Sequence, residues 1–124
     1  MILLDTSFLI RALVVGSAQD RQLRRWLADK ESIGISSIAW TEFLCGPVQP
    51  ALIEVVRRFV TVRAAFDEDD ALLAAQLFNG SDRRRGSLAD CMIAATAIRA
   101  RAALATANAA DFRRFASAGL ELAA

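Results

Sequence analysis

The chain opens on a short apolar run, residues 1–4, which ends at the polar triplet Asp5-Thr6-Ser7. No basic residue precedes the run, and it is far shorter than the roughly 20 residues of a membrane-spanning helix, so it predicts a buried strand rather than a signal peptide or a membrane span. Four further runs have the length and the apolar or β-branched character of strands: 32–36, 60–64, 103–106 and 120–122. The last is expected at an edge of the sheet.

Between these runs, apolar residues recur with the period of a helix. Helices are predicted at 6–14, 18–30, 37–44, 50–59, 67–78 and 87–101, with a last short one after Asn108. Because strands alternate with helices, the connections must cross over, which predicts a mostly parallel sheet with helices on both faces. The expected fold class is therefore α/β, a three-layer α/β/α sandwich, in one domain spanning residues 1–124.

Several apolar side chains are expected in the core because of their place on helix stripes. Leu27 and Leu88 lie on the apolar stripes of two predicted helices, and Trp40 is expected to be buried as well. Cys45 and Cys91 stand apart in apolar surroundings, without the close pairing of a zinc or redox site. We expect both to be buried thiols in a reducing cytosol, so the predicted location is cytoplasmic, with no membrane partner.

Charge and composition narrow the possible chemistry. The formal charge is only +1, from 15 basic and 14 acidic residues, so any nucleic-acid surface must be a local patch. The chain has no histidine, which excludes Ser/His triads, Cys/His pairs, histidine zinc sites and the usual proton shuttle near neutral pH. Whatever chemistry occurs must therefore be carried out by carboxylates.

Four acids fall near the carboxyl ends of predicted strands: Asp5, Glu42, Asp90 and Asp111. Ligands of open parallel sheets bind at this edge, near the point where the strand order reverses. A cluster of carboxylates is unfavourable because like charges repel, unless a cation offsets the repulsion. Mg²⁺ or Mn²⁺ suits an oxygen-only site better than zinc or copper does.

Each acid also has a purely structural interpretation. Asp90 stands three residues after Ser87, which is the spacing of a capping box. The dipole of a helix start also explains Asp111, and exposure to solvent explains Glu42. A helix cap is the weakest explanation for Asp5, because the next two residues can cap the helix instead.

Two charged runs outside this cluster are further candidates for a functional site. The densest acidic run, 67–70, precedes a helical pattern, and we interpret it as a helix start that complements the dipole rather than as a metal site. Arg83, Arg84 and Arg85 lie in the polar loop 81–86. Two interpretations are open for these arginines: a solvated loop, or a substrate-binding patch that grips a phosphate backbone.

Four stretches gain specificity from their order and spacing: Asp5-Thr6-Ser7, Glu42, Ser-Leu-Ala-Asp-Cys-Met-Ile-Ala-Ala at 87–95, and Ala-Thr-Ala-Asn-Ala-Ala-Asp-Phe at 105–112. With them the chain resembles a PIN-domain ribonuclease, specifically the VapC toxin of bacterial type II toxin–antitoxin systems. The resemblance covers nearly the whole chain. It implies an α/β/α sandwich, a carboxylate cluster that binds Mg²⁺ or Mn²⁺, and hydrolysis of RNA phosphodiesters. It further implies a homodimer inhibited by a small VapB-like antitoxin.

The resemblance also assigns residues by position. Asp5, Glu42 and Asp90 match the three core acids, and the fourth position is open between Asn108 and Asp111, of which Asp111 can supply charge. Our hypothesis is metal-assisted hydrolysis in which Asp5 and Asp90 hold a cation, while Glu42 and Asp111 bind a second ion or orient the attacking water.

Three residues are expected to support this site: Thr6, Ser7 and Asn108. Ser7 stands where asparagine is usual in the family. The rival hypothesis from another functional class is a catalytically inactive PIN-like domain that binds RNA or a protein partner without cutting.

Overall fold

A computed structural model of the chain describes residues 1–81 and 87–124. Its centre is a five-stranded, all-parallel sheet in the order β3-β2-β1-β4-β5. The strands are β1 (Ile2–Leu4), β2 (Ile33–Ser36), β3 (Val62–Ala64), β4 (Ala103–Ala105) and β5 (Glu121–Leu122). The predicted parallel sheet is confirmed, and β5 lies at its edge as expected.

Strand β1 occupies the middle of the sheet and pairs with β2 on one side and β4 on the other. The chain builds outward from β1 through β2 to β3, and then returns to the opposite side of β1 with β4 and β5. The strand order therefore reverses between β1 and β4. In open α/β sheets this switch point, at the carboxyl ends of the strands, is where ligands bind.

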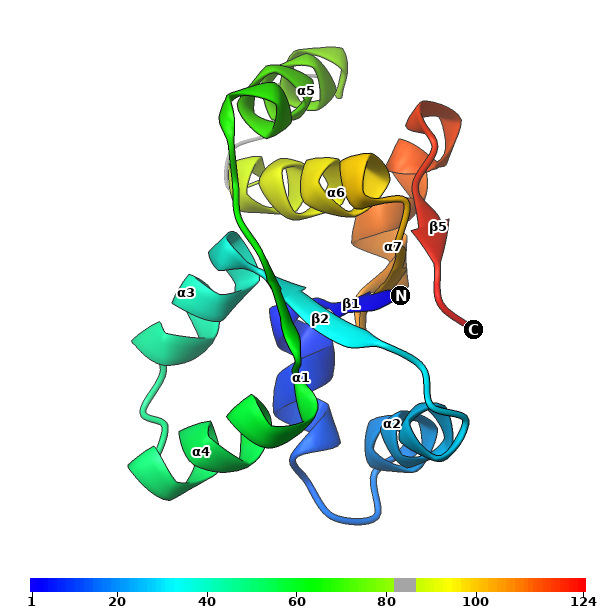
Figure 1. Ribbon diagram of the computed structural model, residues 1–124. Helices are drawn as coiled ribbons and strands as arrows, with labels where there is room; N and C mark the ends of the chain where they lie inside the picture. The colour runs from blue at the N-terminus through cyan, green and yellow to red at the C-terminus, as the bar shows by residue number, and fades with distance from the viewer. Residues whose placement is uncertain (82–86) are drawn as a thin grey trace.

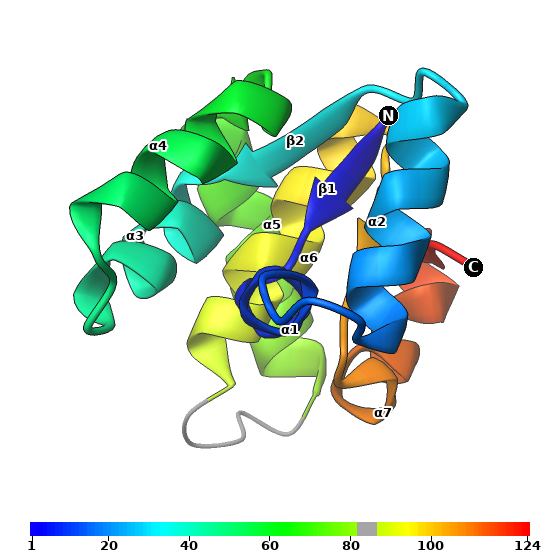
Figure 2. The same ribbon diagram turned by 90° about the horizontal axis from the view of Figure 1, so that it is seen from below.

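Helices cover both faces of the sheet, as the alternation of elements predicted. They are α1 (Thr6–Ala12), α2 (Ala18–Ala28), α3 (Ser37–Cys45), α4 (Pro50–Phe59), α5 (Glu68–Gly80), α6 (Leu88–Ala100) and α7 (Ala109–Phe112), followed by the 3₁₀ helix η1 (Arg113–Ala118). Figure 1 shows α5 and α6 on one side of the sheet and α1, α2 and α4 on the other. Figure 2, the view from below, shows α1 at the end of β1, with α2 on one side of β1 and α4 on the other.

The acidic run 67–70 is a helix start, as predicted. Asp67 and Asp70 form a reciprocal capping box at the start of α5, with each side chain accepting a 2.9 Å bond from the other's backbone amide. Arg99 of α6 donates at 2.9 Å to both carboxylates. Because Asp70 is buried, this network fixes α5 against α6.

The core is built on the central strand. Ile2, Leu3 and Leu4 are all buried, together with residues on the flanking strands. Gly34 in β2 lies where a side chain does not fit, because an added Cβ would come 2.8 Å from Leu3 Cδ2 and 3.0 Å from the carbonyl oxygen of Val62. This close approach explains a glycine inside a central strand.

Three expectations about burial were wrong. Leu27 and Leu88 are 38% and 50% exposed, and Cys45 is exposed, whereas Cys91 is buried as predicted. Trp40 is partly buried and packs against the core. An apolar stripe tells which face of a helix turns inward, but not whether a neighbouring element reaches far enough to cover each residue. In the part of the chain that the structure describes, no helix combines the length and apolar character needed to cross a membrane.

Candidate active site

Asp5 lies directly after β1, at the first position before α1, and is only 5% exposed. Its side chain makes no capping hydrogen bond, so the helix-cap interpretation is wrong. Instead, Ser7 Oγ donates to Asp5 Oδ2 at 2.7 Å, and Thr106 Oγ1 donates to the same oxygen at 2.8 Å. Both bonds fall on Oδ2, and no described side chain donates to Oδ1.

The two hydroxyl groups that hold Asp5 are themselves held by the backbone. The amide of Ala107 donates to Ser7 Oγ at 3.1 Å, and the amide of Asn108 donates to Thr106 Oγ1 at 3.0 Å. Each hydroxyl donates its single hydrogen bond to Asp5 and accepts one hydrogen bond from a backbone amide. The segments after β1 and β4 are thus locked around one carboxylate oxygen.

Glu42 of α3 is exposed, yet its carboxylate is tied to the start of α1. Thr6 Oγ1 donates to Glu42 Oε1 at 2.9 Å and lies 3.2 Å from the carbonyl oxygen of Ala39. Exposure to solvent therefore describes Glu42 only in part, because Thr6, the residue after Asp5, fixes one of its oxygens.

Asp90 lies in the first turn of α6, and Ser87 before it makes no side-chain capping bond, so the capping-box interpretation is wrong. The pKa of Asp90 is raised from the ordinary 3.8 to about 6. Burial is the largest cause, followed by the negative charges of Asp5 and Asp111 and, more weakly, of Glu42. Asp5 at the end of β1, Glu42 of α3 and Asp111 of α7 are thus each close enough to Asp90 to repel its charge.

Asn108 and Asp111 contribute in different ways. Asp111 is exposed in α7, and its charge raises the pKa of Asp90. Asn108 contributes its backbone: its amide holds Thr106, and its carbonyl oxygen accepts the amide of Asp111 at 3.0 Å. Of the two open candidates, Asp111 is therefore the one that adds charge to the cluster.

Arg83, Arg84 and Arg85 lie outside the described residues. Their substrate-binding role stays a prediction.

The donor set fits a hydrated hard cation better than a preformed cage. Within the described ranges, no three carboxylate, thiol or imidazole residues are grouped tightly enough to hold a metal ion by themselves. Mg²⁺ and similar ions keep several waters and need only one or two protein carboxylates together with substrate phosphate. The repulsion that raises the pKa of Asp90 is also what a divalent cation would relieve.

Two residues beside the acids escaped the sequence analysis. Thr106 follows β4 just as Asp5 follows β1, and since Leu4 pairs with Ala105, the parallel register carries the signal that could have identified it. Arg114, near the start of η1, lowers the pKa of Asp90 through its positive charge. The sequence feature that could have identified Arg114 is its position between two aromatic residues, Phe112 and Phe115.

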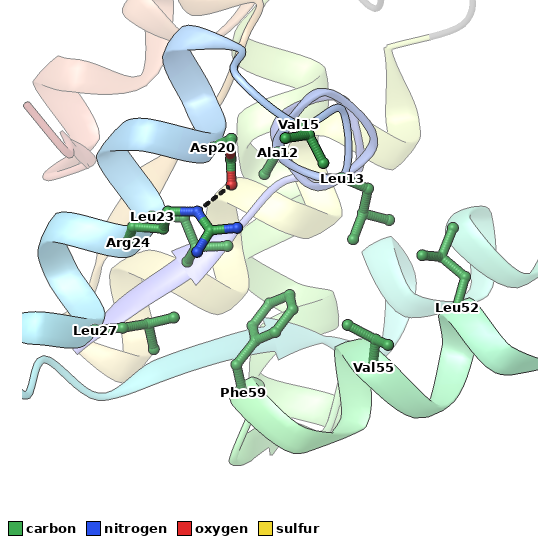
Figure 3. A pocket seen from close by; sticks show the side chains of 10 residues that line it. All are labelled: Ala12, Leu13, Val15, Asp20, Leu23, Arg24, Leu27, Leu52, Val55 and Phe59. Carbon is green, nitrogen blue, oxygen red and sulfur yellow. Dashed lines mark hydrogen bonds and ion pairs between the residues drawn. The ribbon is translucent and has the colours of Figure 1, made fainter.

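An apolar hollow lies apart from the four acids, none of which lines it. It is a groove of about 340 Å³ between α1, α2 and α4, seen from close by in Figure 3. Leu27, Val55 and Phe59 are among its lining residues, and an ion pair of Arg24 Nε and Asp20 Oδ1, 2.9 Å long, lies at its wall. The groove explains the exposure of Leu27, which lines it without being covered.

The sequence pattern of the PIN domain family matches residues 2–118. The chain belongs to the PIN domain family. No protein in a search of curated sequences matches the chain. Several solved structures match the chain. VapBC-1 from nontypeable Haemophilus influenzae is 23% identical, with a TM-score of 0.77 over 99% of this chain and 97% of that one.

Two further solved structures are similar to this PIN domain. A toxin–antitoxin complex from Klebsiella pneumoniae is 25% identical, with a TM-score of 0.74 over 91% of each chain. VapC20 from Mycobacterium tuberculosis, a toxin that cleaves the sarcin-ricin loop, is 22% identical, with a TM-score of 0.64 over 97% of this chain and 96% of that one. The predicted resemblance to VapC toxins is confirmed at the level of the fold.

Proposed function

We propose that this PIN domain is a Mg²⁺- or Mn²⁺-dependent endoribonuclease and acts as the toxin of a toxin–antitoxin pair. The observation that carries the proposal is the raised pKa of Asp90, to about 6, caused by burial and by Asp5 and Asp111. Asp5, Glu42 and Asp111 come from distant parts of the chain and each raise the pKa of Asp90, and Asp5 directly follows the central strand, beside which the strand order reverses. A cluster that repels itself is suited to a divalent cation and, through it, to a phosphate.

The residues would divide the work as follows. Oδ1 of Asp5 and the carboxylate of Asp90 would hold the cation, with Ser7 and Thr106 fixing the orientation of Asp5. When bound, the cation supplies positive charge that stabilises the scissile phosphate. Glu42 Oε1 accepts the hydrogen bond from Thr6 Oγ1, so the other oxygen of Glu42 is available to accept a proton from the attacking water.

Asp111, exposed at the mouth of the cluster, would hold a second ion or orient the same water. The absence of histidine leaves proton transfer to these carboxylates.

A small VapB-like antitoxin is the proposed protein partner, and the groove between α1, α2 and α4 is the surface we assign to it. The groove is apolar, and Val15 and Val55 leave 86% and 44% of their surface exposed at its wall. Uncovered apolar surface of this kind favours a partner's apolar side chains. Solved structures with this fold include toxin–antitoxin complexes. A cytoplasmic location and a homodimer complete the proposal and rest on the resemblance to VapC toxins.

Cleavage of a single-stranded RNA pool by the purified protein tests the enzymatic function. With Mg²⁺ or Mn²⁺ we expect cleavage, and with EDTA we expect none. Asp5→Asn and Asp90→Asn should each lower the rate about 100-fold or more, because each removes a charge that holds the cation. Asp29→Asn, an exposed acid after α2, is the matched control and should cleave normally. RNA binding without cleavage by the wild-type protein would favour the inactive binding module.

A further inference from the structure

Arg114 presents a buried guanidinium that lacks hydrogen-bond partners. Its Nε, Nη1 and Nη2 are all shielded from solvent, and none has a partner among the described residues. Its Cζ lies 4.6 Å from the centroid of the Phe115 ring, so the ring supports the cation without consuming its donors. Burying a charge with unmet donors is strongly unfavourable, so a protein that keeps such a group is expected to use it.

The charge of Arg114 lies next to the acid cluster. Its effect on Asp90 opposes those of Asp5 and Asp111, and it is larger than the effect of Glu42. The pKa of the neighbouring Cys91 thiol is raised, mainly by burial, and the positive charge of Arg114 opposes this rise. Yet none of the ion pairs among the described residues includes Arg114, so the acids do not occupy its donors.

The geometry points to Arg114 as a ligand of the RNA phosphate at the acid cluster. The planar guanidinium offers donors in a fork that matches two oxygens of one phosphate, and it lies over the Phe115 ring, which leaves those donors free. An anion that binds beside Asp90 would satisfy donors that the protein leaves unmet. That the anion is RNA rests on the proposed function, whereas the unmet donors of Arg114 are observed independently of it.

Binding of a short, fluorescein-labelled, single-stranded RNA tests this role without catalysis. Fluorescence anisotropy would be measured in EDTA and again in Ca²⁺, for the wild type, Arg114→Met, Arg114→Lys and Arg113→Met. Arg113 is the matched control, because it is an exposed arginine one position away. Arg114→Met should weaken RNA binding about tenfold, and Arg114→Lys should recover only part of the loss, because lysine keeps the charge without the fork. Arg113→Met should stay within about twofold of the wild type.

Two further readouts separate substrate binding from a structural role. Arg114→Met should melt at the same temperature as the wild type or higher, since an apolar side chain replaces a buried cation with unmet donors. Its Mn²⁺ affinity should rise, because a positive charge beside the acids is removed. A structural role would instead lower the melting temperature and weaken both ligands. If Arg114→Met does not fold, a clear loss of RNA affinity in Arg114→Lys carries the test.

RNA affinity equal to that of the wild type in both Arg114 variants, an equal loss in Arg113→Met, or no RNA binding by the wild type would overturn the inference. The proposed function fails separately, through a wild type that binds RNA but does not cut it in Mg²⁺ or Mn²⁺.

Discussion

Thr106 donates its hydroxyl proton to Oδ2 of Asp5 at 2.8 Å, although 101 positions separate the two residues in the sequence. The contact joins the carboxyl ends of β1 and β4 at the point where the strand order reverses. Ser7 donates to the same oxygen, so the described side-chain bonds of Asp5 all fall on Oδ2.

Removal of the Thr106 hydroxyl should therefore weaken cation binding while the fold is kept. Thr106→Val preserves the shape of the side chain but removes the donor to Asp5 and the acceptor of the Asn108 amide. We expect Mn²⁺ affinity to fall about tenfold or more, as is typical when a residue that orients a ligand is lost. Thr41→Val is the control, because its hydroxyl donates to the Ser37 carbonyl oxygen within the exposed part of α3. Equal Mn²⁺ affinity in Thr106→Val and the wild type would show that the contact does not orient Asp5.

The raised pKa of Asp90 makes the stability of the metal-free protein depend on pH. Because its folded-state pKa, about 6, exceeds the ordinary 3.8, Asp90 favours folding below about pH 4, and this contribution is lost as pH rises through 6. Asp90→Asn should stabilise the metal-free protein at pH 7 by about 1 kcal/mol, after allowance for its partial exposure, and should change little at pH 4. Urea unfolding in EDTA at both pH values measures the difference. A destabilised Asp90→Asn at pH 7 would contradict the repulsion.

Arg99 should matter for stability and not for the proposed site. Arg99→Met removes the ion pairs that join α6 to Asp67 and Asp70, and leaves the buried Asp70 with only its backbone partner. We expect a fall of several degrees in melting temperature and unchanged RNA cleavage. The pKa of Asp67 is lowered, first by the Asp70 amide and then by Arg99, so this stabilisation is present above about pH 4 and is lost as pH falls further. Melting curves at pH 7 and pH 3 should therefore differ more for the wild type than for Arg99→Met. If the melting temperature changes equally between pH 7 and pH 3 in both proteins, Arg99 does not contribute to this stabilisation.

The apolar groove should be required for capture of the antitoxin. Val55→Asp introduces a charge at the groove wall, where it would be buried by an apolar partner segment. We expect loss of co-purification with a co-expressed VapB-like antitoxin, and normal folding. Leu72→Asp is the control: Leu72 is 59% exposed, but it belongs to α5 on the other face of the sheet. Equal capture by both variants would place the partner elsewhere.

Much of the fold follows from local pattern. The central strand, the capped helix starts and the parallel order of strands come from short apolar runs and from the periods between them, so the positions of Asp5 and Asp90 at strand or helix ends were predictable. Thr106 and Arg114 were not predicted, because their roles depend on contacts across the sheet and between turns. Neither the burial of the guanidinium nor the exposure of Leu88 can be read from periodicity, which gives the direction of a side chain but not what covers it.

The most direct test of the central claim is a calorimetric titration of Mn²⁺ into the metal-free protein at pH 7. The wild type should bind Mn²⁺ with a saturating isotherm, and Asp5→Asn should bind at least about tenfold more weakly, because it removes the charge that Ser7 and Thr106 hold in place. Asp29→Asn should match the wild type, and circular dichroism should be the same for all three proteins. Identical isotherms for Asp5→Asn and the wild type, or no heat of binding in any of them, would contradict the account.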